Sequence, residues 1–264
     1  MLSQLLFADD TALVAESAEQ LQCLVSEFGR VCKRRKLRIN VNKSKVMCIE
    51  RNEEPSPLNI TLNGERMEVV SSFKYLGSCF SRGGGVKEDV SMRIGEGMKT
   101  FGAMKSMWSC RSVSLNVKKE LYERIVVPTV MYGSETWGMR REERNKLDVS
   151  EMQCLRNMCG VTRWNRLRNV AVRERVGVKE KMSKRVDRKV LKWFGHVERM
   201  GDERLTKKVY KSEVGGERPV GRPRFRWIDG VKEACEERNI GLATARWKCR
   251  NRSEWRCVTH EIYD

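Results

Sequence analysis

The chain has 264 residues, of which 40% are hydrophobic and 33% charged, as is ordinary for a globular protein. It holds 53 Lys and Arg against 35 Asp and Glu, a net charge of +18. Such an excess favours a polyanionic partner, because each cationic contact to a phosphate releases counterions. Residues 139–200 alone hold 18 basic and 8 acidic side chains. The alternative interpretation of this charge is a set of solvated helix faces.

Other classes of protein are excluded by what the sequence lacks. No run of 18 or more apolar residues is present, so we expect no membrane span. The first residues lack the basic region and long apolar core of a secretory signal. Ten cysteines are scattered without a Cys-x-x-Cys pair, which indicates reduced intracellular thiols rather than a disulfide framework.

The first third of the chain has mainly the period of strands. Two short apolar runs around Ala8-Asp9-Asp10 predict a hairpin with two carboxylates at its tip. Ser17 and Gln20 form a capping-box pattern, which predicts a helix over residues 18–35. The apolar face of that helix is expected to comprise Leu21, Leu24, Val25, Phe28, Val31 and Cys32.

More strands are expected up to residue 80. Alternation predicts short strands over residues 37–41 and 46–50, on either side of Asn42-Lys43-Ser44. Asn63-Gly64 predicts the turn of a second hairpin over residues 60–69. A further single strand is expected over residues 73–80, followed by a flexible break at three glycines.

After the glycines the apolar period changes to that of helices. One long helix is expected over residues 90–108, and a second through residues 121–126, stopped by Pro128. A third is expected over residues 147–158, with Gly160 as its C-cap, and a fourth over residues 186–197. Residues 201–226 are polar and rich in Gly, Pro and Arg, which predicts a linker or arm. Two final helices are expected over residues 228–238 and 243–263.

Asp9 and Asp10 are the strongest candidates for chemistry. Adjacent carboxylates in a strained turn repel each other unless a cation lies between them, so they can hold Mg²⁺. Two such ions can stabilise the attacking and leaving oxygens of a phosphoryl transfer. The alternative interpretation is a solvated turn, because Asp-Asp is also common in turns that have no chemical role.

Several motifs together resemble a known family. Leu5 to Leu13, with Phe7-Ala8-Asp9-Asp10 at its centre, resembles motif C of reverse transcriptases. Residues 37–47, which contain Asn42-Lys43-Ser44, resemble motif D of non-LTR retrotransposon enzymes. Phe73-Lys74-Tyr75-Leu76-Gly77 resembles motif E, and the order and spacing of all three agree.

The resemblance continues to the C-terminus. Tyr132 to Trp137 is similar to a thumb segment of the same elements, and residues 191–200 and 221–229 are similar to their tail. Five ordered blocks across nearly the whole chain resemble the LINE-type, non-LTR retrotransposon reverse transcriptase, from motif C onward. The resemblance implies an α+β fold and an RNA-directed DNA polymerase.

The implied organisation has three parts. Residues 1–82 would form a partial palm of antiparallel strands and one helix, residues 86–180 a helical thumb, and residues 181–264 a basic tail region. RNA and DNA, as template and primer, would be the partners, and Mg²⁺ the cofactor. Basic charge and this parentage favour an intracellular protein of nucleus or cytoplasm. The sequence does not set the oligomeric state.

Particular residues take roles from the resemblance. Asp9 would be the metal-binding aspartate of motif C, with Asp10 its more tolerant neighbour. Lys43 would help protonate the pyrophosphate leaving group, or would be a solvated turn lysine. Tyr75 and Gly77 would help hold the primer end, or would belong to an ordinary packed strand.

One departure from the family pattern affects the expected activity. The family's motif A aspartate and its nucleotide-binding fingers lie N-terminal to motif C, and this sequence begins about one strand before motif C. We therefore expect the chain to be inactive alone, because phosphoryl transfer depends on positioning and electrostatics. The alternatives are a non-enzymatic nucleic-acid-binding remnant co-opted from the element, and a decayed reading frame without function.

Arginines in the C-terminal part are further candidates for nucleic-acid binding. Arg222, Arg224 and Arg226 alternate around Phe225 and Trp227, and mixed cations and aromatics are typical of single-strand binders. A single Gly-Arg-Pro also resembles an AT-hook core. The alternative is a strand that packs its aromatics into a core with the arginines outside.

A zinc site and a catalytic histidine are weaker hypotheses. Four residues could ligate zinc, but their spacing lacks a knuckle and buried thiols are favoured instead; they are Cys235, Cys249, Cys257 and His260. His196 is expected to be half-buried beside Trp193 and Phe194.

Overall fold

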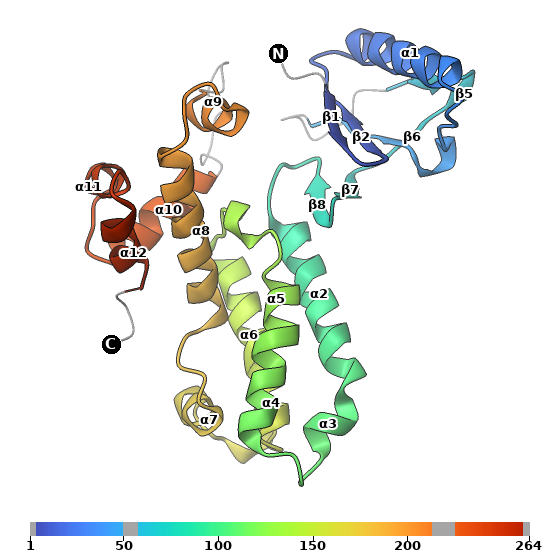
Figure 1. Ribbon diagram of the computed structural model, residues 1–264. Coiled ribbons are helices and arrows are strands. Elements are labelled where there is room, and N and C mark those ends of the chain that lie inside the picture. Colours follow the sequence, from blue (N-terminus) through green and yellow to red (C-terminus); the bar gives the residue numbers. More distant parts are fainter. Residues whose placement is uncertain (1–3, 50–57, 213–224, 261–264) are drawn as a thin grey trace. The chain divides into compact units, whose positions relative to one another are not determined.

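The computed structural model describes residues 4–49, 58–212 and 225–260 (Figure 1). Within it the chain divides into two compact units, residues 1–85 and residues 86–264. The tail region expected from residue 181 onward shares one hydrophobic core with residues 86–180.

The first unit contains four two-stranded sheets in its described part. Three are antiparallel and one is parallel, which together with the helices is consistent with the α+β class. The pairs are β1 (Gln4–Phe7) with β2 (Asp10–Leu13), β3 (Lys45–Val46) with β6 (Glu68–Val69), β4 (Thr61–Leu62) with β5 (Glu65–Arg66), and β7 (Ser72–Tyr75) with β8 (Ser78–Ser81).

The helix α1 (Ala18–Arg34) forms where the capping pattern predicts it. The Ser17 side chain accepts a hydrogen bond from the Gln20 amide at 3.3 Å, whereas the Gln20 side chain accepts from the Glu16 amide instead of closing the box on Ser17. Val25 and Cys32 are buried as predicted, but Val31 is exposed. The predicted apolar face of α1 therefore departs from the structure at Val31.

A side chain of α1 pairs with the backbone of β4. The Gln22 amide donates to the Thr61 carbonyl at 2.9 Å and accepts from the Thr61 N–H at 2.8 Å. These two hydrogen bonds satisfy both the N–H and the carbonyl of Thr61, as a neighbouring strand would. It brings α1 over the small core of this unit, which consists of Val25, Val46, Ile60, Leu62 and Met67.

Two turns decide the path of the chain between β4 and β8. Asn63 and Gly64 have φ values of 53° and 84°, as a type I′ turn requires, so the predicted hairpin is confirmed. Leu76 and Gly77 have φ values of 48° and 85° and make a second turn of this kind. The single strand expected over residues 73–80 is therefore wrong, because the chain reverses at this turn and Tyr75 pairs with Ser78.

The strand expected over residues 37–41 is also wrong. The chain is irregular there and then forms the 3₁₀ helix η1 (Val41–Lys43). The Asn40 side chain accepts a hydrogen bond from the Lys43 N–H at 3.1 Å, and such a local side-chain bond competes with strand pairing. The strand expected over residues 46–50 overlaps the observed strand β3 (Lys45–Val46) at Val46.

The second unit is helical throughout its described part (Figure 1). Its α-helices are α2 (Lys87–Ala103), α3 (Lys105–Ser109), α4 (Leu115–Leu121), α5 (Val127–Val130), α6 (Arg141–Met158), α7 (Asn169–Val176), α8 (Met182–Glu198), α9 (Leu205–Lys211), α10 (Trp227–Glu236), α11 (Leu242–Lys248) and α12 (Arg252–His260). A π-helix, η2 (Tyr122–Val126), and the 3₁₀ helices η3 (Ser134–Thr136) and η4 (Arg163–Asn165) complete it. None of the helices in the described ranges has the length and apolarity needed to span a membrane.

The long helix expected over residues 90–108 is interrupted at Met104. The helix α2 ends there and α3 begins one residue later. The Trp108 indole donates to the Phe101 carbonyl at 2.6 Å, and the two rings stack with centroids 4.5 Å apart. The buried indole thus gives a second hydrogen bond to a carbonyl that already accepts from the Met104 N–H at 3.1 Å.

The prediction that Pro128 stops its helix is wrong. The π-helix η2 joins α4 directly to α5, and Pro128 falls in the first turn of α5. Proline is tolerated at that position because the first N–H groups of a helix have no intrahelical partner. The wider π turn thus carries the helical path past a residue that an uninterrupted α-helix would exclude.

The C-terminal end of α6 agrees with the prediction. Gly160 has a φ of 66°, and the Val161 N–H donates to the Arg156 carbonyl at 3.0 Å. This is the bond of a Schellman motif, in which glycine supplies the left-handed residue. Sequence analysis did not predict α7, whose eight residues lack a strong apolar period.

The last third contains more helix than expected. The helix α9 lies inside the expected linker, and the Lys207 amine holds it by donating to the Glu198 carbonyl at 3.0 Å. The helix expected over residues 243–263 is two helices, because Asn251 accepts from the Ser253 N–H at 3.0 Å and so caps the start of α12. Helices α8 and α10 form as predicted.

Two glycines in α2 should respond oppositely to the same substitution. A Cβ at Gly97 would lie 2.2 Å from a methyl carbon of Val130, whereas a Cβ at Gly95 would meet nothing within 4 Å. We expect Gly97→Ala to destabilise the second unit by about 1–3 kcal/mol through overpacking. We expect Gly95→Ala to stabilise it by about 0.5–1 kcal/mol, since alanine favours helix. Urea unfolding followed by tryptophan fluorescence tests this, because all seven tryptophans lie in this unit. Equal shifts for both variants would contradict the packing.

Candidate functional site

The predicted carboxylate turn forms at the tip of the β1–β2 hairpin. Phe7 pairs with Asp10, so Ala8 and Asp9 are the two loop residues. Ala8 has a φ of 52°, in the left-handed region that favours glycine. A non-glycine residue held there stores backbone strain of about 1 kcal/mol or more, and such strain is often found at functional sites.

Asp9 and Asp10 are both exposed at this turn. Carboxylate oxygens are the ligands that Mg²⁺ takes in proteins, commonly one or two together with substrate phosphates. The turn therefore fits part of a magnesium site. No group of three or more His, Cys, Asp or Glu side chains that could hold a metal occurs among the described residues. The two aspartates are thus not joined there by a third carboxylate.

Lys43 is the last residue of η1 and its side chain is exposed. Asn40 fixes this segment, because its side chain accepts from the Lys43 N–H and its carbonyl accepts from the Ser44 hydroxyl at 2.9 Å. The backbone of the motif D segment is therefore held by its own polar residues, while the Lys43 amine is free to reach a ligand.

Tyr75 and Gly77 lie on either side of the turn between β7 and β8. Gly77 supplies one of the two left-handed positions of that turn. Tyr75 is half-buried, and its hydroxyl is buried without a hydrogen-bond partner in the described part of the chain. A buried unpaired hydroxyl is costly, so Tyr75 is the candidate residue whose polar group the described residues leave unsatisfied.

The candidate residues of the first unit lie on three separate local structures. Asp9 and Asp10 are adjacent at one turn, Lys43 ends a 3₁₀ helix, and Tyr75 precedes a second turn. Within the residues that the structure describes, no hydrogen bond or ion pair links Asp9 or Asp10 to Lys43 or Tyr75.

Arg226 is the one of the three candidate tail arginines that can be described; Arg222 and Arg224 lie outside the described residues. It is the N-cap of α10, and its guanidinium pairs with Asp229 at 3.4 Å while remaining 75% exposed. Trp227 is packed instead: its indole donates to the Glu135 carbonyl at 2.9 Å and its ring meets Tyr210 edge-on. For Trp227 this favours the alternative in which the aromatic side chain packs into the core, although it does so from a helix rather than a strand.

The candidate zinc ligands are dispersed. Cys235 and Cys249 are buried, and burial raises the pKa of Cys235 to about 11 and of Cys249 to about 12. A zinc ligand must be a thiolate, which these environments disfavour. Cys257 and His260 are exposed. His196 was expected to be half-buried, but it is exposed, because it lies on the solvent side of α8 with its ring 5.3 Å from Trp193.

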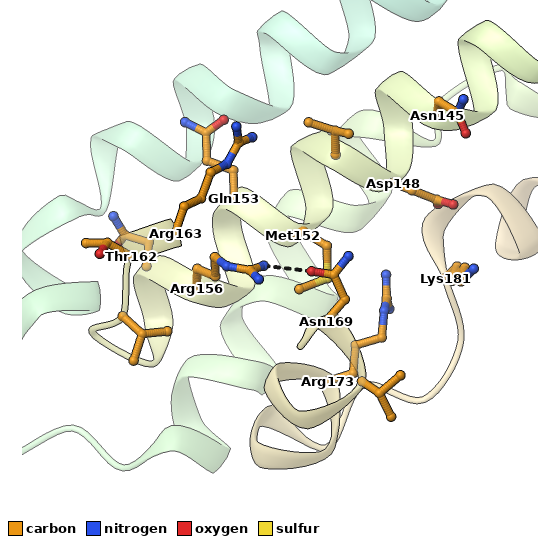
Figure 2. Close-up of a pocket in the computed structure, with 14 residues that line it drawn as sticks. Asn145, Asp148, Met152, Gln153, Arg156, Thr162, Arg163, Asn169, Arg173 and Lys181 are labelled. Atoms are coloured by element: carbon orange, nitrogen blue, oxygen red, sulfur yellow. Dashed lines mark hydrogen bonds between the residues drawn. The ribbon is translucent and has the colours of Figure 1, made fainter. Parts of the chain in front are cut away.

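A cavity of about 950 Å³ lies between α6, η4 and α7 in the second unit (Figure 2). Its lining combines cations with amides, and the residues drawn in the figure include Asn145, Asp148, Gln153, Arg156, Arg163, Asn169, Arg173 and Lys181. Arg156 spans the cavity wall, donating to the Asn169 side chain at 3.0 Å and to the Leu167 carbonyl at 2.8 Å. This cavity was not among the sites expected from the sequence.

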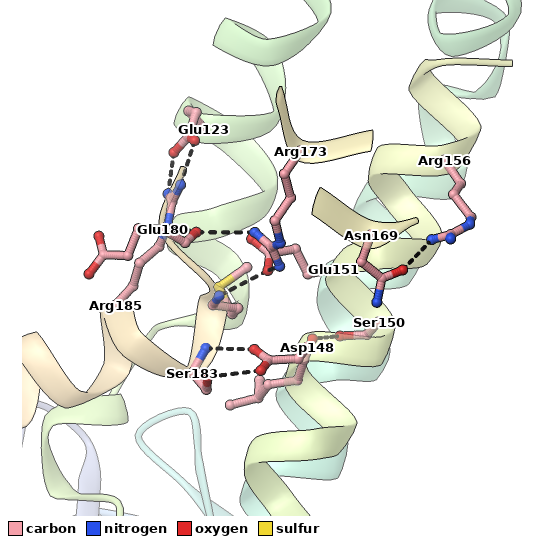
Figure 3. A network of polar contacts seen from close by, with 12 residues as sticks. Glu123, Asp148, Ser150, Glu151, Arg156, Asn169, Arg173, Glu180, Ser183 and Arg185 are labelled. Carbon is pink, nitrogen blue, oxygen red and sulfur yellow. Dashed lines mark hydrogen bonds and ion pairs between the residues drawn. The ribbon is translucent and has the colours of Figure 1, made fainter. Parts of the chain in front are cut away.

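A buried polar network joins α6, α7 and α8 beside this cavity (Figure 3). Glu151 of α6 is 1% exposed and pairs with Arg173 of α7. The same carboxylate accepts from the Met182 N–H at 2.9 Å, and Asp148 accepts from the Ser183 N–H and hydroxyl, each at 3.0 Å. Two carboxylates of α6 thus cap the first N–H groups of α8.

Burial raises the pKa of Glu151, while its pairing with Arg173 acts in the opposite direction. The sequence carries a signal for this residue, because Glu151 lies four residues from both Leu147 and Leu155 on the apolar face of α6. A carboxylate at such a position must be paired with another helix.

Comparison with known proteins agrees with the motifs. Residues 2–80 match the reverse transcriptase (RNA-dependent DNA polymerase) family. The chain is 24% identical over 268 positions to a transposon-derived protein of Caenorhabditis elegans, covering 97% of this chain and 95% of that protein. No solved structure matches the chain.

Two further relatives are RNA-directed DNA polymerases from the mobile element jockey. The Drosophila melanogaster protein is 24% identical over 176 residues, and the Drosophila funebris protein 23% over 172 residues. Each comparison covers 62% of this chain and 19% of the polymerase. Together these findings support a retroelement protein related to reverse transcriptases, and reverse transcriptases as a family act on nucleic acid and use divalent metal.

Removing the Glu151 carboxylate should strongly destabilise the second unit. Glu151→Ala would leave the Arg173 guanidinium buried without its partner, at a cost of about 3–5 kcal/mol. The double variant Glu151→Leu/Arg173→Met should recover most of that loss, because both buried charges are then absent. Urea unfolding followed by tryptophan fluorescence measures both variants. A loss below about 1 kcal/mol for Glu151→Ala would contradict the role of the pair.

The thiols should differ widely in reactivity. A hydrogen bond from the Ser112 hydroxyl lowers the pKa of Cys110, whereas burial raises the pKa of Cys154 to about 12. Since the thiolate is the reactive form, Cys110 should react rapidly with an aromatic disulfide at pH 7.5, and Cys154 only after unfolding. Mass spectrometry of timed samples checks this, and Ser112→Ala should slow Cys110 alone. Rapid labelling of Cys154 in the folded protein would contradict the buried core.

Proposed function

We propose that this chain is the part of a non-LTR retrotransposon reverse transcriptase that begins at motif C, and that it holds nucleic acid without polymerising by itself. The observation that carries the proposal is the hairpin turn at Asp9 and Asp10, inside the segment that matches the reverse transcriptase family. In this proposal residues 1–82 are a partial palm, residues 86–180 a thumb, and residues 181–264 a basic tail.

The proposed roles follow the exposed groups of the first unit. Asp9 and Asp10 would hold Mg²⁺, which when bound supplies charge stabilisation to a phosphoryl transfer. The exposed Lys43 amine would donate a proton to a phosphate leaving group. Tyr75 and the tight turn at Gly77 would help to hold the primer strand.

The proposed lack of autonomous polymerase activity rests on the number of ligands. The described residues bring two carboxylates to the turn and no third metal-binding side chain beside them. Phosphoryl transfer gains nearly all of its rate from positioning and electrostatics, so an incomplete ligand set lowers the rate steeply. The two jockey polymerases are about five times as long as the part of them that aligns here.

Nucleic-acid retention is proposed from charge and from the relatives. The net charge of +18 is concentrated in residues 139–200, within the second unit. The relatives whose printed names include RNA-directed DNA polymerase align with this chain over 62% of its length. A primed RNA–DNA duplex is therefore the expected ligand.

The affinity of the purified chain for a primed RNA–DNA duplex should fall steeply with salt. We expect log Kd against log salt to have a slope of about 4 or more, as for several neutralised phosphates. Added Mg²⁺ should tighten binding, and Asp9→Ala should abolish this tightening without changing the salt slope. Glu65→Ala is the matched control, because it removes an exposed carboxylate beside a different hairpin turn.

Templated nucleotide incorporation by the same 264-residue chain tests the second half of the proposal. No incorporation above background is expected with or without Mg²⁺. Incorporation that disappears in Asp9→Ala and persists in Glu65→Ala would overturn the proposed inactivity. Absence of salt-dependent binding to nucleic acid would overturn the proposed function as a whole.

A further inference from the structure

The most exposed large aromatic side chain in the described residues is Trp164, at 92% exposed. It lies in the 3₁₀ helix η4, on the loop that leads from α6 to α7. The other large apolar side chains of the second unit that are exposed are less so, Trp247 at 62% among them. An indole this exposed leaves the face of its ring available to a stacking partner.

The loop around Trp164 is held by its own polar groups. The Asn165 side chain accepts from the Thr162 N–H at 2.7 Å and from the Thr162 hydroxyl at 3.0 Å. Arg166 then takes a left-handed φ of 53°, and Arg156 ties the following segment to α6 through the Leu167 carbonyl. The indole is thus presented on a fixed turn, which reduces the entropy lost on binding.

The charge around Trp164 is strongly positive. Residues 161–181 contain seven basic and two acidic side chains. Arg173 is used within the fold, where it pairs with Glu151. Arg163, Arg166 and Arg168 are exposed, and in the described ranges none of them has a carboxylate partner. They flank Trp164 at spacings of one, two and four residues.

The neighbouring cavity extends this cationic surface. Arg163 lies at one side of it and Lys181 at another, with Gln153 and Asn157 among the lining residues (Figure 2). Amide groups can donate to phosphate oxygens and can also bond the edges of bases. Arg163 lines the cavity and Trp164 follows it in η4, so the exposed indole belongs to the residue next to the cavity wall.

We propose that this surface binds single-stranded nucleic acid, with one base stacked on Trp164 and the adjoining phosphates bound by Arg163, Arg166 and Arg168. The inference rests on the proposed function and names the site that recognises a single strand. Single-strand binders combine a cationic groove with aromatic side chains on which bases stack. A duplex offers its bases already stacked, so the exposed indole favours a single strand.

The test uses the full chain and a fluorescein-labelled 12-nucleotide thymidine oligomer, with a 12-base-pair duplex as the second probe. Trp164→Ala should weaken binding of the single strand by roughly 5- to 150-fold, as for one lost base–aromatic stack, and should leave the salt slope unchanged. Trp164→Phe should retain most of the affinity. Trp247→Ala, which removes another exposed indole, is the matched control and should have little effect.

The arginines are tested by the salt slope. Arg163→Gln/Arg168→Gln should lower the slope for the single strand by about 1.4, since each lost phosphate contact contributes about 0.7. Arg111→Gln/Arg250→Gln removes the same charge from two other exposed positions and should change the slope less.

The outcomes separate this site from the general proposal. Salt-dependent binding by the wild-type chain, with Trp164→Ala equal to Trp247→Ala, would overturn the site and leave the proposed function standing. An equal loss for both probes in Trp164→Ala would also overturn it, because stacking is expected with the single strand only. Absence of salt-dependent binding to either probe would overturn both proposals.

Discussion

The second unit depends on one buried carboxylate. Glu151 is surrounded by core residues and pairs with Arg173, and it also caps the Met182 N–H at the start of α8. One oxygen of this carboxylate accepts from both the Arg173 guanidinium and the Met182 N–H, and losing either partner is costly for a buried charge, so α6, α7 and α8 have little freedom to shift independently. The loop between α6 and α7 inherits this constraint, because Arg156 joins its end to α6. A side chain that stacks on a ligand from a short turn, as proposed for Trp164, needs such a rigid support.

The first unit is organised differently, by turns rather than by a buried charge. Its core consists of five buried residues, and its sheets are two-stranded within the described part. Sheets of that size are marginal alone, so tight turns and the Gln22–Thr61 double hydrogen bond contribute much of the order. All four residues of β1 are exposed, with Phe7 at 62%. The strain at Ala8 therefore lies in a hairpin with little packing of its own, which makes the geometry of Asp9 and Asp10 sensitive to whatever covers β1.

Sequence reasoning succeeded where the chemistry is local. Ser17 begins α1, Asn63-Gly64 makes a hairpin and Gly160 ends α6, because each acts through bonds to its own neighbours. It failed where distant contacts decide. Pro128 does not end its helix because a π turn precedes it, and α9 forms because Lys207 reaches Glu198. The turn at Asp9 and Asp10 was predictable because it, too, depends on neighbouring residues in the chain. The cavity and the role of Trp164 were not, because they arise from the approach of α7 to α6, which a single sequence does not encode as a periodic pattern.

Net charge alone is a poor guide to where nucleic acid would bind. Much of the basic surplus in residues 139–200 is used within the fold: Arg144 pairs with Asp187, Arg173 with Glu151 and Arg185 with Glu123. Asp187 and Glu151 are buried and Glu123 is partly buried, so the three cations are neutralised within the fold and contribute little outward field. What distinguishes a binding surface is positive charge without an internal partner, beside a group that can recognise a base. The segment from Arg163 to Arg168 meets both conditions, and its cations are unpaired within the described residues. Arg226, by contrast, is engaged with Asp229 and stands next to a tryptophan that is already packed. The loop between α6 and α7 is therefore better suited to single-strand recognition than the start of α10.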